Sequence, residues 1–277
     1  MAEIDVTIEV KSPIHLNSGQ ADVNVDAEIV HDAFGFPYFP AKRFKGLLYE
    51  SALEVLEMFE LSGLDTDNLA PLEEIFHRQS TSDIQLIVPN FFIRPADEYE
   101  NFCAEWKYLQ RTYPEIFTPF DVLNSFTSLR YQTRLIDGVA ADGSLHNMRV
   151  LDAGLKFFGR ITVLNDDKKV LNLLALAIKN LTSAGMKRNR GFGRIECRAT
   201  VDNKSIDKLV EKIFREGDLN SAQDKNFAKN SVADSAVVSK QLDGHDGNAY
   251  GDKRLDNSRG VGNALRKAKK ARRRGAR

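Results

Sequence analysis

The feature that most limits the fold of this 277-residue chain is the order in which its hydrophobic periodicity changes. Strand-like alternation of apolar and polar side chains, or a short apolar run, marks residues 4–10, 128–136, 148–163 and 195–201. Helical spacing of apolar side chains marks residues 41–60 and 168–181. The resulting order of strand, helix, strands, helix and strand predicts an α+β, ferredoxin-like (RRM-like) βαββαβ domain.

Three further segments have strand or helix patterns that this order does not place directly. Residues 21–30 alternate, with apolar side chains on one face and the acidic side chains Asp22, Asp26 and Glu28 on the other. Residues 84–93 resemble a strand interrupted at Pro89, and residues 99–113 resemble a helix. We expect the stretch from about 61 to 128 to form an insertion, and the fold to carry thumb-like and lid-like insertions.

Charge is distributed unevenly along the chain. The last 13 residues hold eight Lys or Arg and no acid, which leaves a net charge of −8 for residues 1–264. We expect a folded domain over residues 1–205, a mostly disordered linker over 206–264 that becomes strongly polar beyond about 215, and a basic tail over 265–277. Because the body is acidic on average, a nucleic-acid site on it must be a local patch.

Composition excludes several classes of protein. No run of about 18 apolar residues suggests a membrane span, and the first ten residues do not resemble a secretory signal. The two cysteines, Cys103 and Cys197, lack metal-type spacing, which argues against a structural zinc site. These features predict a cytoplasmic protein with no membrane partner.

The segment TSAGMKRNRGFGR, residues 182–194, combines glycines with cations between a helix and a strand. Gly185 stands where a helix C-cap glycine is common. Gly191 and Gly193 flank Phe192 at the entrance to a strand, where glycines often mark close approach of another backbone or a ligand. Bare backbone N–H groups beside cationic side chains predict a phosphate site, although basic glycine loops also occur as solvated turns.

The first predicted helix begins with cations instead of acids. Lys42, Arg43 and Lys45 lie in the turn that follows Pro40. Cations there oppose the helix dipole, so they do not serve helix stability. A helix N-terminus with adjacent cations is a second candidate phosphate site.

Three segments together resemble the CRISPR-associated RAMP superfamily, in particular the backbone subunits of type III effector complexes. They are VDAEIVHDAFGFPYFPAKRFKGLLYESA (25–52), RLIDGVAADGSLHNMRVLDAGLKFFGRI (134–161) and GMKRNRGFGR (185–194). In such proteins the glycine-rich loop and the Lys-Gly helix start contact the backbone of a guide RNA. The resemblance thus implies crRNA, target single-stranded RNA and other CRISPR effector subunits as partners. The implied RNA-binding residues are Lys42, Arg43, Lys45, Gly46, Gly185, Lys187, Arg188, Arg190, Gly191, Gly193 and Arg194.

The resemblance also implies a catalytic residue. Type III backbone subunits cut target RNA with an aspartate that precedes the Lys-Gly helix, and Asp26 occupies that position here. Asp26 would be the protein ligand of Mg²⁺ or Mn²⁺, with water and RNA phosphates as the others. A shift of register would assign this role to Asp22, and Asp26 could also be no more than the exposed side of a strand.

Other functions remain open from the sequence. The chain could be a non-catalytic subunit that caps the 5′ end of the crRNA, or a metal-independent crRNA-processing endoribonuclease that uses His31, or less directly His15, as acid or base. It could also be an unrelated single-stranded RNA-binding protein. A thumb-like projection could come from residues 84–125 or 137–147. The aromatics of the insertion could stack on bases or form a small core of their own.

Overall fold

The computed structural model describes residues 1–76, 85–164 and 167–215. The strands are β1 (Ala2–Val10), β2 (Gln85–Ile87), β3 (Thr127–Gln132), β4 (Leu135–Ile136), β5 (Val139–Ala140), β6 (His146–Leu151), β7 (Lys156–Leu164), β8 (Ile195–Val201) and β9 (Lys204–Ser205). The helices are α1 (Ala41–Ser62), α2 (Leu72–Phe76), α3 (Ala96–Thr112), α4 (Pro119–Ser125), α5 (Lys168–Asn180) and the short 3₁₀ turn η1 (Arg188–Arg190).

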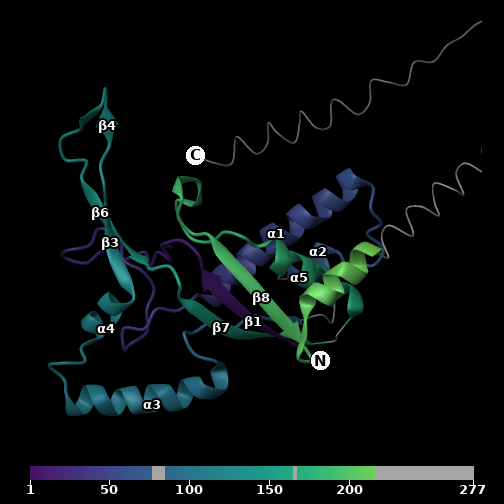
Figure 1. The fold of residues 1–277 in the computed structure, drawn as a ribbon, viewed down its shortest axis with the longest axis horizontal. Helices are drawn as coiled ribbons and strands as arrows, with labels where there is room; N and C mark the ends of the chain where they lie inside the picture. Colours follow the sequence, from purple (N-terminus) through teal and green to yellow (C-terminus); the bar gives the residue numbers. More distant parts are fainter. Residues whose placement is uncertain (77–84, 165–166, 216–277) are drawn as a thin grey trace, which may run out of the picture. The chain divides into compact units, whose positions relative to one another are not determined.

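The main sheet confirms the ferredoxin-like prediction. Its strand order is β2-β7-β1-β8-β9, and all neighbouring strands are antiparallel. β1, β2, β7 and β8 are therefore the four strands of a βαββαβ unit, with α1 after the first strand and α5 after the third. β1 lies at the centre, between β7 and β8 (Figure 1).

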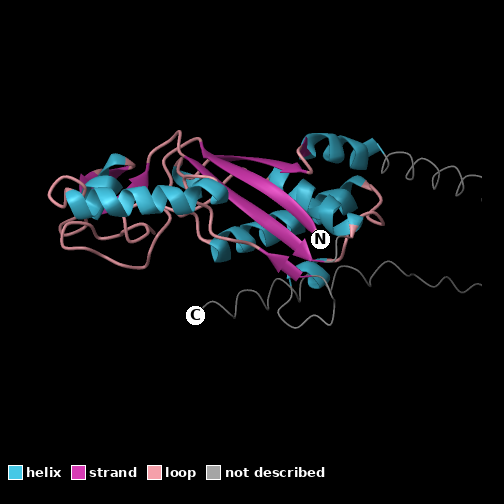
Figure 2. Cartoon of the chain, turned by 90° about the horizontal axis from the view of Figure 1, so that it is seen from below, coloured by secondary structure: helices cyan, strands magenta, loops and turns pink. Residues whose placement is uncertain are grey.

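The core lies between the sheet and the helices α1 and α5 (Figure 2). Alternate side chains of β1 point inward, and all four of its predicted apolar positions are buried: Ile4, Val6, Ile8 and Val10. The buried face of α1 is the predicted one: Phe44, Leu48, Ala52, Val55 and Phe59. This agreement follows from period 2 in the strand and period 3.6 in the helix, since each period places its apolar side chains on one face.

The ends of the two core helices are set by local chemistry. α1 starts directly after Pro40, which is extended, and ends at Gly63 in the left-handed region, whose N–H bonds the carbonyls of Glu60 and Phe59. α5 starts at Asp167, whose carboxylate accepts the N–H of Lys169. These caps define both ends of α1 and the start of α5.

The middle of the chain departs from the expected strand assignment. β2, which falls inside the expected insertion, is an edge strand of the main sheet, paired to β7 over three residues. Residues 127–132 instead pair with β6 in a separate two-stranded ribbon, whose tip carries β4 and β5. We call β3 and β6 the β3–β6 ribbon; Figure 1 shows it extending away from the main sheet. Periodicity identified these strands but not their partners, because pairing is decided by which strand edge is open.

Residues 21–30 are not a regular strand, which corrects a second expectation. They form the end of an irregular hairpin in which Asn17 bridges Ile29 and Asp22 bridges Val25. We call residues 16–30 the Asp26 hairpin. Val23, expected on the buried face, is 95% exposed, and Glu28, expected on the wet face, is 9% exposed. Contacts with the ribbon, described below, override the alternation.

The folded part extends past the expected boundary at residue 205. Residues 206–215 are helical, and Ile206 and Ile213 join the core, while Phe214 packs on Phe59. The rest of the expected linker and the basic tail at 265–277 lie outside the described residues. Among the helices of the described part, none is long and apolar enough to cross a membrane.

Candidate RNA-binding groove and Asp26 site

The glycine-rich loop, residues 182–194, has an unusual backbone. Gly185, Lys187, Gly191 and Gly193 all have positive φ, between 59° and 82°. Lys187 adopts the left-handed backbone region, which costs a residue with a side chain more free energy than it would cost glycine. The loop thus turns sharply around η1, which presents the side chains of Arg188 and Arg190 outward.

Two of these glycines are required by neighbouring backbone. A Cβ on Gly193 would lie 1.9 Å from the carbonyl oxygen of Ala184, and a Cβ on Gly185 would lie 2.8 Å from that of His15. Gly193 also donates its N–H to the Pro13 carbonyl at 2.9 Å. Gly191 differs, because nothing lies within 4 Å of the position of its missing Cβ. Close approach within the protein therefore explains Gly185 and Gly193, and Gly191 faces open space.

The structure brings together the start of α1 and the glycine-rich loop, two segments more than 130 residues apart that the sequence marked as separate candidate phosphate sites. A groove of about 340 Å³ is lined by Lys42, Arg43 and Gly46 from α1 and by Gly185 and Arg188 from the loop. A second hollow of about 630 Å³ adjoins it, sharing Gly185 and Arg188. The cations that line the two are Lys42, Arg43, Lys187, Arg188 and Arg190. We call this surface the cationic groove; Glu50 is the carboxylate that lines it.

The cations of the groove are incompletely neutralised. Arg188 lies 3.6 Å from the carboxylate of Glu50, which is itself largely exposed. Lys187 donates to the side-chain oxygen of Gln132, and Arg43 donates to the Asn17 carbonyl, so both have uncharged partners. Burial lowers the pKa of the Lys187 ammonium, and the charge of Arg190 lowers it further. An anion in the groove would relieve this electrostatic cost.

Four of the predicted RNA-binding residues do not line the cationic groove. Lys45 turns toward the Leu86 carbonyl, 3.5 Å away, and lines a neighbouring hollow beside β2 that shares Lys42 and Gly46 with the groove. Gly191 and Gly193 shape the loop without lining the groove, and Gly193 is buried. Arg194 is exposed at the entrance to β8 and uses its backbone to pair with residues 11 and 12. The sequence grouped these residues because they are adjacent in the chain, but the local backbone and packing set the direction of each side chain.

The uncovered face of the main sheet does not offer a second cationic surface. Its charges pair with one another: Arg160 bonds Asp5 at 2.6 Å, Lys11 bonds Glu196 at 3.0 Å, and Arg198 bonds the same carboxylate. Hydrogen bonds from Arg198 and Lys11 lower the pKa of Glu196 to about 2. Since these cations are already satisfied by carboxylates, the groove is the better phosphate site.

Asp26 lies on the hairpin that leaves the groove. Leu16 and Asn17 line the groove, and the 16–20 strand of the hairpin pairs with 28–30 through backbone bonds such as Val30 N–H to the Leu16 carbonyl, 2.9 Å. Asp26 is three residues from Ile29, the bridge partner of Asn17. Three extended residues span at most roughly 11 Å and the bridge to Asn17 adds roughly 5 Å, so Asp26 lies within about 16 Å of this groove residue.

Asp26 is held by the β3–β6 ribbon. Its N–H donates to the side-chain oxygen of Asn147, and its Oδ2 accepts the backbone N–H of Asn147, each at 2.8 Å. The side-chain amide of Asn147 also donates to the Asn24 carbonyl at 2.9 Å. One residue of β6 therefore fixes both the backbone and one carboxylate oxygen of Asp26, while the side chain stays exposed. Asp22, the alternative, is exposed at the tip and accepts the N–H of Val23.

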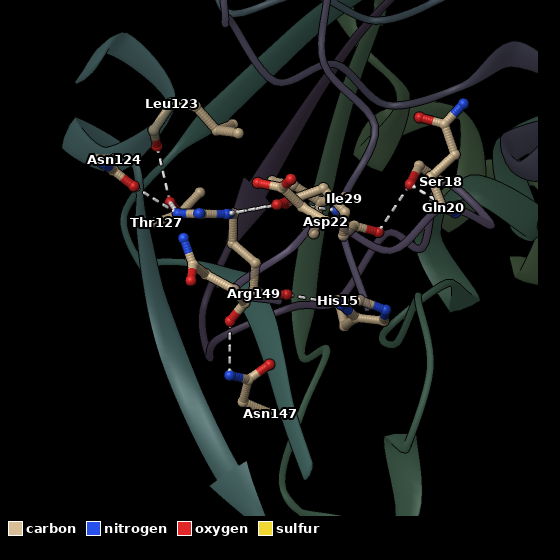
Figure 3. A network of polar contacts seen from close by, with 12 residues as sticks. His15, Ser18, Gln20, Asp22, Ile29, Leu123, Asn124, Thr127, Asn147 and Arg149 are labelled. Atoms are coloured by element: carbon tan, nitrogen blue, oxygen red, sulfur yellow. Dashed lines mark hydrogen bonds and ion pairs between the residues drawn. The ribbon is translucent and has the colours of Figure 1, made fainter. Parts of the chain in front are cut away.

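A buried ion pair anchors the same hairpin, and the sequence reasoning did not identify it. Arg149 is 3% exposed, and its Nε lies 2.8 Å from Oε1 of Glu28 (Figure 3). The guanidinium also donates to the side chains of Asn124 and Thr127. Glu28 in turn accepts the N–H of Ile29. The sequence signal was weak, since a single arginine in an apolar strand, MRVL, indicates only that a partner must exist.

The two candidate histidines occupy different environments. His15 is 2% exposed, and burial lowers the pKa of its imidazole from the ordinary value of 6.5. Its Nδ1 lies 2.6 Å from the Arg149 carbonyl, which can only accept, so Nδ1 carries the proton. His31 is exposed, and its ring contacts the carbonyl of the next residue, Asp32, at 2.8 Å. No carboxylate or second histidine of the described chain contacts the ring of His31.

The aromatics of the insertion divide between a local core and the surface. Trp106 packs against Phe36, Phe102 and Phe117, and these rings line an apolar cavity of about 680 Å³. Three further aromatic side chains are exposed: Tyr108, Tyr113 and Phe120. The half-buried aromatics of the insertion therefore pack with Phe36 into a small cluster of their own.

Comparison with known proteins decides the family. The model of the RAMP superfamily matches residues 7–196. The chain belongs to the RAMP superfamily. A chain of the type III-B Cmr-beta bound to cognate target RNA is 11% identical, and the match covers 75% of this RAMP chain and 98% of that one, with a TM-score of 0.50.

A chain of the type III-B Cmr-beta in the apo state is also 11% identical, covering 72% of this RAMP chain and 97% of that one, with a TM-score of 0.49. No protein of curated function matches the sequence. At 11% identity the likeness establishes a shared fold, so the roles of individual residues must be argued from this structure.

The residues around Asp26 fit a divalent cation only in part. Within residues 1–76, 85–164 and 167–215, no group of three or more His, Cys, Asp or Glu side chains could hold a metal ion. Glu28 is committed to Arg149, and one oxygen of Asp26 is committed to Asn147. This RAMP chain therefore offers one exposed carboxylate oxygen. Mg²⁺ is often bound in that way, by one or two carboxylates together with substrate phosphates and water.

Proposed function

We propose that this RAMP chain is a subunit of a type III CRISPR RNA-guided effector complex of the cytoplasm. It holds the crRNA backbone in the cationic groove, and it cleaves target RNA paired to that guide at Asp26. The observation that carries the proposal is the groove itself, where five cations from two distant segments face one carboxylate. The fold shared with a chain of the Cmr-beta bound to target RNA supports a type III complex, with other effector subunits as further partners.

The groove suits a phosphodiester backbone better than a base. Its cations are lysine and arginine side chains. Of these, Lys42 and Arg190 make no ion pair with the described chain. The 22-residue helix α1 adds the positive end of its dipole, with no acid in its first turn. Such contacts fix register without reading sequence, as a guide of variable sequence requires.

The cleavage role rests on the position of Asp26. Its Oδ1 has no partner among the described residues, while the two bonds to Asn147 hold the carboxylate in place. With RNA bound, Asp26 would contribute this oxygen to a Mg²⁺ or Mn²⁺ ion, which would activate the attacking oxygen or stabilise the leaving one. The protein itself positions the carboxylate and, through the groove, the strand.

Cleavage by the guide-loaded complex with Asp26→Asn tests this role. Asn keeps an oxygen that can accept the Asn147 N–H, so the hairpin is preserved while the charge is removed. We expect the barrier to cleavage of target RNA in Mg²⁺ to rise by several kcal/mol, which slows cutting roughly a thousandfold, with guide and target binding unchanged. Asp22→Asn, at the tip of the same hairpin, is the matched control and should cut normally.

The same assay separates the other functions. Unchanged cutting in Asp26→Asn would contradict the catalytic role and leave the chain as a scaffold or as a cap on the 5′ end of the crRNA. Cleavage of precursor crRNA that persists in EDTA and is lost in His31→Ala would assign the processing role instead. Equal affinity for guide and unrelated single-stranded RNA would indicate a general RNA-binding protein.

A further inference from the structure

The insertion contains an apolar cavity that the proposed RNA contacts do not use. It measures about 680 Å³ and shares no residue with the cationic groove. Its walls come from α3, from α4 and from the turn that leads into β7, with Phe102, Trp106, Val122 and Leu155 among the lining side chains. A recess of this size, mainly apolar with a few polar groups, is typical of a binding site.

α3 leaves its apolar face incompletely covered. It runs for 17 residues without burying one side chain, although Phe102 and Trp106, four residues apart, lie on the same face. Phe36 packs against both rings, with centroids 4.8 and 5.1 Å from its own, and both remain only half-buried. An amphipathic helix of a folded domain normally buries this stripe, so the face that lines the cavity is open to an occupant.

Trp106 also has an unmet hydrogen-bonding group. Its indole Nε1–H is buried and has no acceptor among the residues that the structure describes. A buried tryptophan N–H normally finds a partner, since an unmade bond carries the full cost of desolvation. An occupant with a carbonyl or carboxylate oxygen would provide that acceptor.

The charged residues of the cavity favour an acidic occupant. Arg94 and Lys156 line it, both are exposed, and neither forms an ion pair within the described chain. Glu9 lies opposite Lys156 in the sheet, but it bonds Lys11 at 2.6 Å. Asp121, the carboxylate of the lining, accepts the hydroxyl of the residue that caps α4. Two unpaired cations against one carboxylate give the site a net positive charge, which complements an acidic partner.

The walls are fixed to one turn, residues 32–36. Tyr99, near the start of α3, donates its hydroxyl to Oδ2 of Asp32 at 2.6 Å. The start of α4 lies against the same turn, because a Cβ on Gly35 would be 2.0 Å from the Pro119 carbonyl oxygen. The cavity is thus preformed, and an occupant binds without the entropic cost of ordering its walls.

We propose that this cavity docks an acidic, apolar segment of another protein chain. Large apolar side chains of the segment enter between α3 and α4, and a carboxylate beside them pairs with Arg94 and Lys156. A polypeptide supplies apolar side chains, carboxylates and carbonyl oxygens together, and Trp and Arg are among the residues that most often dominate protein interfaces. RNA fits less well, because two cations beside apolar walls do not follow a row of phosphates. The docking site does not depend on the proposed RNA-binding and cleavage roles.

Fluorescence of Trp106 tests the docking directly, because the chain contains one tryptophan. A random peptide library is selected on the purified full-length chain, and individual selected peptides are then titrated against it. We expect the selected peptides to combine large apolar side chains with Asp or Glu, and to shift the Trp106 emission to shorter wavelength in a saturable way. Replacing the acids of a peptide by lysine should weaken its binding about tenfold.

Ser125→Phe fills the cavity from α4, where Ser125 lines it and is exposed. Peptides that also bind this variant, for example in the cationic groove, are removed by counter-selection before the titration. Arg94→Glu, at an exposed position of the rim, should weaken binding of the remaining peptides more than about tenfold. Lys107→Ala is the matched control, because Lys107 is an exposed cation of α3 that does not line the cavity, and it should bind as the native chain does.

Loss of every selected peptide in the counter-selection, or an unchanged Trp106 emission, would overturn the proposal. Enrichment of basic peptides, or equal binding by Arg94→Glu and the native chain, would overturn it as well. A single-stranded RNA oligonucleotide that shifts the Trp106 emission where the peptides do not would assign the cavity to RNA instead.

Discussion

The glycine-rich loop and the Asp26 hairpin lie on either side of residues 13–15, yet different interactions hold them in place. The loop is held by backbone: Gly193 N–H bonds the Pro13 carbonyl, and Met186 N–H bonds the His15 carbonyl. The hairpin is held largely by side chains of β6, through Asn147 and Arg149. A larger side chain at a glycine should therefore destabilise the glycine-rich loop. Removal of particular polar side chains should destabilise the Asp26 hairpin.

The difference bears on function. A surface that binds phosphates needs a fixed backbone with variable side chains, and the glycine-rich loop has that form. A catalytic carboxylate needs one side chain held at a defined position, which the two bonds from Asn147 provide. His15 contacts the loop by its carbonyl, which accepts the Met186 N–H, and contacts β6, the strand that holds the hairpin, by its ring at the Arg149 carbonyl.

The largest expected effect is on the backbone-held element. Gly193→Ala places a Cβ 1.9 Å from the Ala184 carbonyl oxygen at a φ of 77°. Strain in the left-handed region together with the overlap should cost on the order of 5 kcal/mol of unfolding free energy. Thermal denaturation of the purified chain should show this, whereas Gly191→Ala, in open space, should cost about 1 kcal/mol. Equal losses of stability in the two variants would contradict the account of the loop.

The next effect concerns the side-chain anchor. Arg149→Met leaves the carboxylate of Glu28 buried without its partner, so the free energy of unfolding should fall by about 3–4 kcal/mol in urea denaturation. The double variant Arg149→Met with Glu28→Gln removes both charges and should recover part of that stability. If the effects of the two single substitutions simply add in the double variant, the pair is not coupled.

A smaller effect is expected in the cationic groove. Arg190→Ala should weaken guide-RNA binding by about 1.5 kcal/mol, roughly tenfold in Kd, with little change in stability. The slope of log K against log salt should fall by about 0.7 for each phosphate that the groove no longer neutralises. Lys45→Ala is the control, since Lys45 turns toward β2 from a hollow that adjoins the groove and should change both quantities less than Arg190→Ala does. A greater loss of affinity in the control would place the RNA on the other side of α1.

The smallest effect is a pH dependence at His15, which links the glycine-rich loop to β6. Burial lowers the pKa of this imidazole, so the unfolded chain takes up its proton first as the pH falls. The contribution of His15 to stability is complete above the ordinary pKa of 6.5 and declines as the pH falls below it toward the folded-state value. His15→Asn, which can still donate to the Arg149 carbonyl, should reduce the slope of stability against pH between about 7 and 5. An identical slope would exclude His15 as its source.

Much of the fold was predictable because it depends on local periodicity. β1, α1, α5 and β8 were all identified from spacing, and the βαββαβ topology follows from their order. The start of α1 after Pro40 and the glycines of the 182–194 loop have local causes that short sequences reveal. The sequence marked both segments as candidate phosphate sites, and their convergence in one groove was seen only in the structure.

The candidate site beyond the groove was not predictable in the same way. Glu28 was expected on an exposed face because its segment alternates, but Arg149, 121 residues away, draws it into the interior. Lys45 and Arg194 were grouped with the groove by adjacency, and packing turned them elsewhere. Neither outcome has a signature in the sequence close to the position concerned.

The sequence by itself determined the elements and the cationic loop, since periodicity, caps and glycine positions act over a few residues. Only the tertiary structure decided that residues 127–151 leave the main sheet as a ribbon, that β2 takes the vacant edge, and that Asn147 holds Asp26. These outcomes depend on which open strand edge and which buried charge meet after the chain has folded, and contacts between distant residues leave no periodic trace in the sequence.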